Sequence, residues 1–123
     1  MHFHMLKRMS SSCAKWGGAG SSHVIADICI TPIGVGISVS KEIIEVEKVL
    51  QSYPVKCKLH AYGTNIEGEW EDVMAAIKAS HIKLHELGVS RVSSNMRFGT
   101  RTDKYQTMED KINVVENGLR NTQ

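Results

Sequence analysis

Three side chains with different hydrogen-bonding groups lie close together near the middle of the chain. Thr64, Asn65 and Glu67 fall between Gly63 and Gly68. Glycine allows backbone conformations and close approaches that a Cβ atom would block. A hydroxyl, an amide and a carboxylate can therefore be held on one tight, ordered segment, as a ligand site requires. The alternative is a β-hairpin whose glycines serve only the turn.

Two aromatic side chains flank these groups. Tyr62 precedes them and Trp70 follows them. An aromatic face attracts a cation or a flat ring, so either residue could stack on a ligand. Trp70 also begins the longest helical pattern of the chain, and packing in the core is the alternative role for it.

Three basic side chains surround a turn that we expect after the last strand. Arg97, Arg101 and Lys104 could hold a phosphate or a sulfate through charge-assisted hydrogen bonds. The alternative is a set of solvated charges that bind nothing.

Two histidines have a spacing that metal sites use. His81 and His85 are four residues apart in a helical pattern, but the stretch lacks the glutamate of zinc proteases and offers no third ligand. Gly34 and Gly36 do not complete a dinucleotide-binding motif. No nucleophile with a partner base is readable in the sequence. We therefore expect no metal, no cofactor and no enzymatic reaction.

The composition is that of an ordinary globular protein with one domain. The chain has 123 residues, of which 41% are hydrophobic and 23% charged, and a net charge of +2. So small a charge does not argue for a nucleic-acid partner. No apolar run approaches the roughly 18 residues of a membrane span. Three cysteines without a paired spacing suit a reducing compartment.

Residues 1–23 differ from the rest of the chain. They contain Lys7, Arg8 and Lys15, no acidic residue, and a piece rich in serine and glycine. We interpret this segment as a disordered extension, and a mitochondrial transit peptide, which has the same basic and acid-poor composition, is the alternative. We expect residues 24–123 to form the folded domain and to fold without residues 1–22. The expected location is the cytoplasm, with the mitochondrion left open by this extension.

Hydrophobic periodicity predicts the order of strands and helices. Alternation predicts strands over 24–31, 55–62 and 91–98, with a further short strand in the glycine-flanked segment. Pro32 is expected to end the first strand. Helical spacing predicts three helices. We expect Ser38 or Ser40 to cap the first, Gly88 to follow the second, and Thr107 with Asp110 to open the third.

This order, β-α-β-β-α-β and then a helix, predicts an α+β fold: a ferredoxin-like sandwich with an additional C-terminal helix. Both crossover helices then cover one face of the sheet. We expect the third strand at one edge and the fourth at the other, beside the second. The opposite face should carry a polar set that a ligand or a second subunit covers: Asp27, Thr31, Lys58, His60, Tyr62, Ser93, Asn95 and Arg97.

Four parts of the sequence, in order and with matching gaps, resemble the thiamine-binding protein family. They are Asp27–Gly34, Gly63–Trp70, the strand with Arg91 and Arg97, and Lys111–Glu116. The resemblance implies a ferredoxin-like fold, a homodimer or homotetramer, and a small ligand such as thiamine or a related pyrimidine. The N-terminal extension departs from the family's usual form.

A ligand of this kind would need a carboxylate, an aromatic face and several hydrogen-bonding groups. We expect it on the polar sheet face near a subunit contact. The residues expected to bind it are Thr64, Asn65, Glu67, Tyr62, Trp70, Asn95 and Arg97. The alternative function is a structural or regulatory homo-oligomer that binds an anion through Arg97, Arg101 and Lys104.

Overall fold

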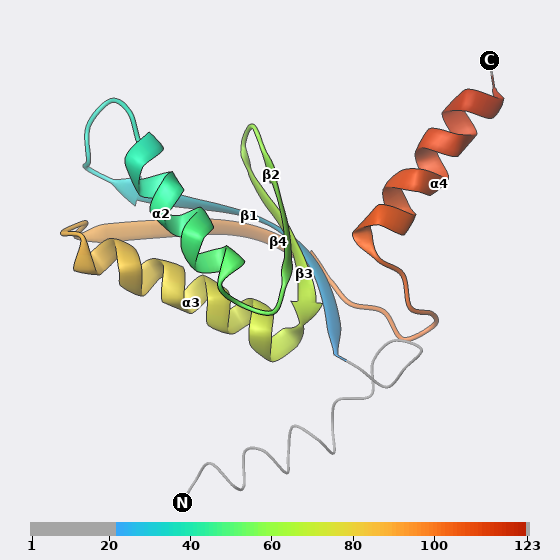
Figure 1. Cartoon of the computed structure of the whole chain (residues 1–123), viewed down its shortest axis with the longest axis horizontal. Helices are drawn as coiled ribbons and strands as arrows, with labels where there is room; N and C mark the ends of the chain where they lie inside the picture. Colours follow the sequence, from blue (N-terminus) through green and yellow to red (C-terminus); the bar gives the residue numbers. More distant parts are fainter. Residues whose placement is uncertain (1–21, 123) are drawn as a thin grey trace, which may run out of the picture. The chain divides into compact units, whose positions relative to one another are not determined.

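The computed structural model describes residues 22–122. These residues belong to two units, one formed by residues 24–99 and one that contains residues 100–122 together with Ser22 and His23. The expected N-terminal extension lies outside the described residues, except for Ser22 and His23. The elements (Figure 1) are β1 (His23–Ile33), α2 (Ser40–Gln51), β2 (Lys56–His60), β3 (Gly63–Glu69), α3 (Trp70–Glu86), β4 (Arg91–Gly99) and α4 (Met108–Asn121).

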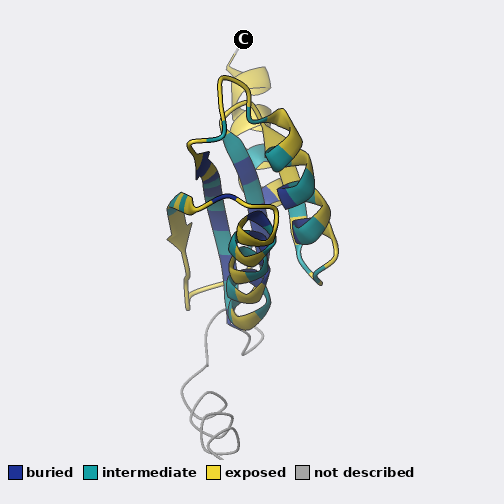
Figure 2. Ribbon diagram, turned by 90° about the vertical axis from the view of Figure 1, so that its left-hand side faces the viewer, coloured by how far each residue is buried: buried dark blue, intermediate teal, exposed yellow. Residues whose placement is uncertain are grey.

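The unit of residues 24–99 is a two-layer sandwich. Its four strands form one sheet in the order β2-β3-β1-β4. The helices α2 and α3 pack against each other and cover the same face of this sheet (Figures 1 and 2). This confirms the α+β fold and the ferredoxin-like order of elements that the sequence predicts.

The core lies between the sheet and the two helices. Along β1 the side chains alternate between buried and less buried positions, as expected for a strand with one covered face. The buried apolar side chains come from every layer: Val24, Ala26, Ile28 and Ile30 on β1, Ile66 on β3, Val46 and Leu50 on α2, and Val73, Ala76 and Leu84 on α3. Burial of this apolar surface is the main force that holds the two layers together.

The predicted positions of two strands were wrong. β3 lies inside the sheet between β2 and β1, and β4 lies beside β1 rather than beside β2. The short connection from His60 to Gly63 makes β3 pair directly with β2. The crossover through α2 leaves room for one strand between β1 and β2, and β3 fills it. The crossover through α3 then takes the chain past β1, so β4 becomes an edge strand.

The prediction that Pro32 ends the first strand was also wrong. β1 continues to Ile33, and Pro32 pairs with Val92 on β4. β3 begins beside the Ile28 carbonyl and runs back toward the start of β1 (Figure 1). Proline lacks a backbone donor. β3 does not extend alongside Pro32. The backbone N–H group that proline lacks is therefore not needed for a hydrogen bond to β3.

Two of the three predicted helix boundaries are confirmed. Gly88 has a φ of 96° after α3, and the Val89 N–H donates to the Leu84 carbonyl over 3.0 Å, which closes the helix in a Schellman motif. Thr107 and Asp110 form a reciprocal capping box at the start of α4. The serine caps predicted for α2 were wrong, because Val39 occupies the N-cap position and makes no side-chain cap bond.

Candidate functional site

The length of β1 creates a hollow on the covered side of the sheet. β1 extends beyond the turn that joins β2 to β3, and α2 passes above this extension. A cavity of about 220 Å³ lies there, which we call the α2 cavity. Its lining is mainly apolar and comes from four parts of the chain: residues 28–32 of β1, Val39 and the inner side of α2, Leu59 and Ala61–Gly63 around the β2–β3 turn, and Thr64.

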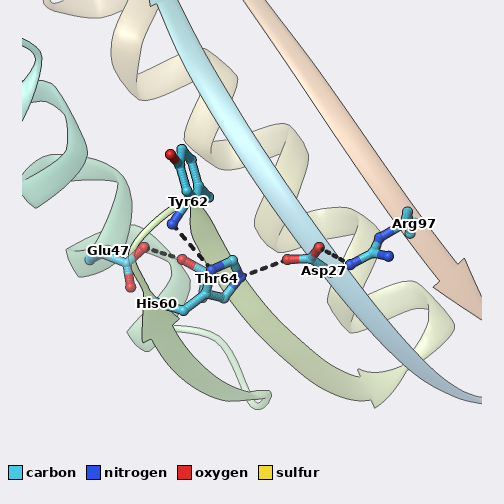
Figure 3. A network of polar contacts seen from close by, with 6 residues as sticks. All are labelled: Asp27, Glu47, His60, Tyr62, Thr64 and Arg97. Carbon is cyan, nitrogen blue, oxygen red and sulfur yellow. Dashed lines mark hydrogen bonds and ion pairs between the residues drawn. The ribbon is translucent and has the colours of Figure 1, made fainter.

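A carboxylate and a hydroxyl are paired on the wall of the α2 cavity. The Thr64 hydroxyl donates to Oε2 of Glu47 over 2.6 Å (Figure 3). Thr64 is held there because it faces the helices from β3, next to the buried Ile66. Glu47 comes from the inner side of α2, one residue after the buried Val46. A carboxylate at an apolar wall stabilises a ligand that brings a positive charge or N–H donors.

Tyr62 lines the same cavity from the turn between β2 and β3. Its side chain is 87% exposed, so the ring can be approached from solvent. The Tyr62 backbone N–H donates to Nδ1 of His60 over 3.2 Å. This bond connects the cavity to a second group of polar side chains on the opposite sheet face.

That second group is an ionic row across the sheet, formed by His60 of β2, Asp27 of β1 and Arg97 of β4 (Figure 3). Nε2 of His60 lies 2.7 Å from Oδ1 of Asp27, and the Arg97 guanidinium donates to Oδ2 over 2.8 Å. Because Nδ1 of His60 accepts from Tyr62, Nε2 carries the proton and donates to Asp27. The hydrogen bonds from Arg97 and His60 hold the pKa of Asp27 below its usual value.

Gly63 makes this row possible. A Cβ atom at position 63 would lie 2.4 Å from the Ile28 carbonyl oxygen and 3.3 Å from Cε1 of His60. The missing side chain allows β3 to lie close to β1 and allows the His60 ring to reach Asp27 past β3. Gly63 therefore permits a close approach of backbone and side chain, as the sequence suggested, and does not serve only the turn.

The predicted ligand residues do not share one face of the sheet. Alternation along β3 places Thr64 on the covered face, and Asn65 and Glu67 on the opposite one. Asn95 and Arg97 also lie on that opposite face, since they pair with Cys29 and Asp27. The expectation that Thr64 and Glu67 hold one ligand on the uncovered face was therefore wrong. Residues an odd number of positions apart on a regular strand point in opposite directions.

Trp70 and Glu67 have surroundings that differ from a ligand-binding surface. Trp70 is partly buried against the core, and its ring meets that of Phe98 edge to face at 5.5 Å between centroids. This contact favours the packing role for Trp70. Glu67 is buried and lies opposite Lys56 in the register of β2 and β3.

Two of the three residues predicted to bind an anion contact acidic side chains. Arg97 binds Asp27, as described above. Arg101 donates through Nε to Oδ1 of Asp103 over 2.7 Å and also to Gln106, and this guanidinium lowers the pKa of Asp103 to about 2. Lys104 is exposed. Two of the three cations are thus already matched by a carboxylate, which leaves them less available to an external anion.

The two histidines of α3 contact different groups. Nε2 of His81 lies 2.6 Å from the Ser94 hydroxyl, whereas Nδ1 of His85 donates to the Val89 carbonyl over 2.8 Å. Burial, with a smaller contribution from the neighbouring His85, lowers the pKa of His81. Between residues 22 and 122, no three His, Cys, Asp or Glu side chains are grouped as a metal site requires.

Comparison with known proteins identifies the relatives of this chain. The profile of the thiamine-binding protein family matches residues 26–116. The chain belongs to this family. Its relatives include a UPF0045 protein of Synechocystis, 51% identical over 100 residues that cover 81% of this chain and 83% of the relative. The UPF0045 protein ECM15 of Eremothecium gossypii is 45% identical over 98 residues, which cover 79% and 93% of the two chains.

Solved structures of similar proteins have the same fold. The protein MJ1052 of Methanocaldococcus jannaschii superposes with a TM-score of 0.72 at 33% identity, covering 77% of this chain and 97% of its own. A Thermotoga maritima protein, whose name refers to thiamine biosynthesis or salvage, gives a TM-score of 0.62 at 20% identity and covers 76% and 98%. At that identity the second likeness supports the fold alone.

In this member of the thiamine-binding protein family, the sequence-based prediction missed Glu47. The residue is four positions after Ile43 and three before Leu50, so it lies on the stripe of α2 that faces the sheet. A carboxylate within an apolar helical stripe is a signal that could have identified it. Its partner Thr64 was predicted as a site residue, although on the wrong face.

Among residues 22–122, no helix combines the length and the apolar character needed to cross a lipid bilayer.

Proposed function

We propose that this protein is a non-catalytic binding protein for thiamine or a related pyrimidine and that it acts as a homo-oligomer. The observation that carries the proposal is the Glu47–Thr64 pair on the wall of the α2 cavity. Membership of the thiamine-binding protein family supports the same ligand class.

The size of the cavity determines how such a ligand would bind. Typical ligand pockets measure about 300–1,000 Å³, and the α2 cavity measures about 220 Å³. A single aromatic ring fits this volume better than a two-ring ligand does. We therefore place the aminopyrimidine inside and let the second ring extend toward Tyr62.

The polar groups match this orientation. The Thr64 hydroxyl donates one hydrogen bond to Oε2 of Glu47. The remaining lone pairs of the carboxylate can therefore accept hydrogen bonds from the N–H groups of an aminopyrimidine. A cationic thiazolium outside the cavity would find the exposed ring of Tyr62, and a cation over an aromatic face is stabilised. This arrangement needs only one subunit, unlike the site predicted from the sequence.

Titration calorimetry with thiamine tests the proposal. Glu47→Gln keeps the shape of the side chain and removes the charge, so it should weaken binding by about 1.5–3 kcal/mol, the usual contribution of a hydrogen bond to a charged group. Glu45→Gln is the matched control on α2, because Glu45 binds Lys48 and lies close to Lys83 rather than lining the cavity. Its affinity should equal that of the parent.

Two results would contradict this placement. Equal affinity of Glu47→Gln and the parent would exclude the α2 cavity. A loss of affinity in Glu67→Gln with none in Glu47→Gln would indicate that the ligand binds on the opposite sheet face. Thiamine recovered unchanged after long incubation would support the absence of catalysis, and a new product would contradict it.

We base the proposal of a homo-oligomer on the uncovered face and the open edges of the sheet. Within residues 24–99, both helices lie on one face, and β2 and β4 are edge strands. Open edges and an uncovered face favour association with further copies. Light scattering at micromolar concentration should give a mass well above 13.7 kDa, the mass of one chain. A mass equal to that of one chain would contradict the proposal.

A further inference from the structure

The helix α4 has an apolar face with the spacing of a coiled coil. Met108, Ile112, Val115 and Leu119 are separated by four, three and four residues. These intervals are those of successive d, a, d and a positions in a heptad repeat. The capping box of Thr107 and Asp110 fixes the start of the helix immediately before this face.

The second half of this face is in contact with solvent, and Ile112 is half-buried. Val115 is 61% exposed and Leu119 is 59% exposed, although Met108 in the first turn is buried. A helix of 14 residues is close to the length at which isolated helices are only marginally stable, about 12–15 residues. Gly118 weakens it further, because glycine is a poor helix former. The helix would gain stability from a partner that covers Val115 and Leu119.

The charges beside the apolar face indicate what that partner is. In the same heptad, Lys111 takes a g position and Glu116 the following e position. In a parallel pair of identical helices, a g residue faces the next e residue of the other helix. Lys111 of each copy would therefore meet Glu116 of the other. An antiparallel pair would instead bring Glu109 and Glu116, both at e positions, together.

We propose that α4 pairs in parallel with α4 of a second copy of this chain, with Ile112, Val115 and Leu119 forming the shared seam beyond the buried Met108. The proposal rests on the homo-oligomer proposed above and does not depend on the ligand. Because the helices are short, the seam adds to association through other surfaces and does not replace it.

Two adjacent valines provide a matched test in the full-length protein. Val115 lies in the seam, whereas Val114 occupies a c position outside it, and the two are 61% and 65% exposed. Val115→Lys would place an unpaired charge in the seam and should raise the dissociation constant of the oligomer at least about tenfold. Val114→Lys should leave it unchanged. Light scattering over a concentration series gives the constants, and circular dichroism confirms that both variants fold.

Charge reversal tests the parallel orientation. Lys111→Glu should weaken association, because the carboxylate introduced by this change would face Glu116 of the other copy. Adding Glu116→Lys should restore the parent's dissociation constant, since the pair is then reversed but complementary. In an antiparallel pair these two positions do not face each other, and the second change would not rescue the first.

Three outcomes would overturn the proposal. One is an unchanged dissociation constant in Val115→Lys. Another is equal weakening by Val114→Lys and Val115→Lys. The third is the absence of rescue in the double charge variant. A Val115→Lys protein with a lower melting temperature and the parent's mass would show that the face is covered within one chain.

Discussion

The two faces of the sheet are stabilised in different ways, although the same strands form both. On the covered face, side chains such as Ala26 and Ile28 pack against the helices, and two polar pairs, Glu47–Thr64 and His81–Ser94, join a helix to the sheet. On the opposite face, Asp27, which lies between Ala26 and Ile28 in the sequence, joins His60 to Arg97. The alternation of β1 thus separates an apolar layer from an ionic row.

This difference determines how much each face contributes to the free energy of unfolding. Apolar burial contributes about 25 cal/mol for each Å² removed from water, whereas exposed ion pairs contribute little because water and salt screen them. Stability should therefore depend mainly on the covered face. The ionic row should affect the charge and hydrogen bonding of its surface more than the free energy of unfolding.

The largest effect is expected from the core of the covered face. Ile66 is fully buried, and Ile66→Ala should lower the free energy of unfolding by about 2–5 kcal/mol through lost burial and a cavity. Ile44, which is 54% exposed on α2, is the control, and Ile44→Ala should cost about 0.5 kcal/mol or less. Urea denaturation measures both. Equal losses would show that the covered face does not dominate stability.

An intermediate effect is expected where the two faces meet at Gly63. Gly63→Ala would push a methyl group against the Ile28 carbonyl and toward the His60 ring, and overpacking of this kind costs about 1–3 kcal/mol. The His60–Asp27 hydrogen bond should weaken in the same variant. The control is Gly99→Ala, because a Cβ atom there meets no atom within 4 Å. If both variants unfold at the parent's urea midpoint, β3 does not require a glycine at position 63.

Some features of both faces can be predicted from the sequence alone. Periodicity along the chain predicted which strands and helices exist and that β1 has one apolar face, because side-chain direction repeats every two or 3.6 residues. The capping of α4 was equally readable, since Thr107 and Asp110 are three residues apart.

Contacts between distant segments could not be predicted from such local patterns. Asp27 and Arg97 are 70 positions apart, and Glu47 and Thr64 are 17 apart on different elements. Pairing them requires the strand order, and the order predicted from the sequence put β3 at an edge. The error over the face of Thr64 has a different cause, because Thr64 and Glu67 were expected to share a face although they are three positions apart on one strand.

The smallest effect is expected from the ionic row, and it should depend on pH. Asp27→Asn removes the charge that Arg97 and His60 bind, and an exposed pair of this kind contributes about 0.2–1 kcal/mol. Urea denaturation at neutral pH should show a loss of this size, and added salt should reduce it. A loss as large as that in Ile66→Ala would contradict the contrast between the two faces.

The direction of the pH dependence follows from the lowered pKa of Asp27. An unfolded chain would titrate this carboxyl near the ordinary value of 3.8, and the folded protein titrates it lower because of Arg97 and then His60. The unfolded state therefore binds more protons in this range, and the stabilisation is complete above pH 3.8. It is lost as the pH falls through the lower, folded value. The difference in stability between the parent and Asp27→Asn should shrink as the pH falls below 3.8. A difference that grows below pH 3.8 would show that Asp27 is not held in its charged form by this row.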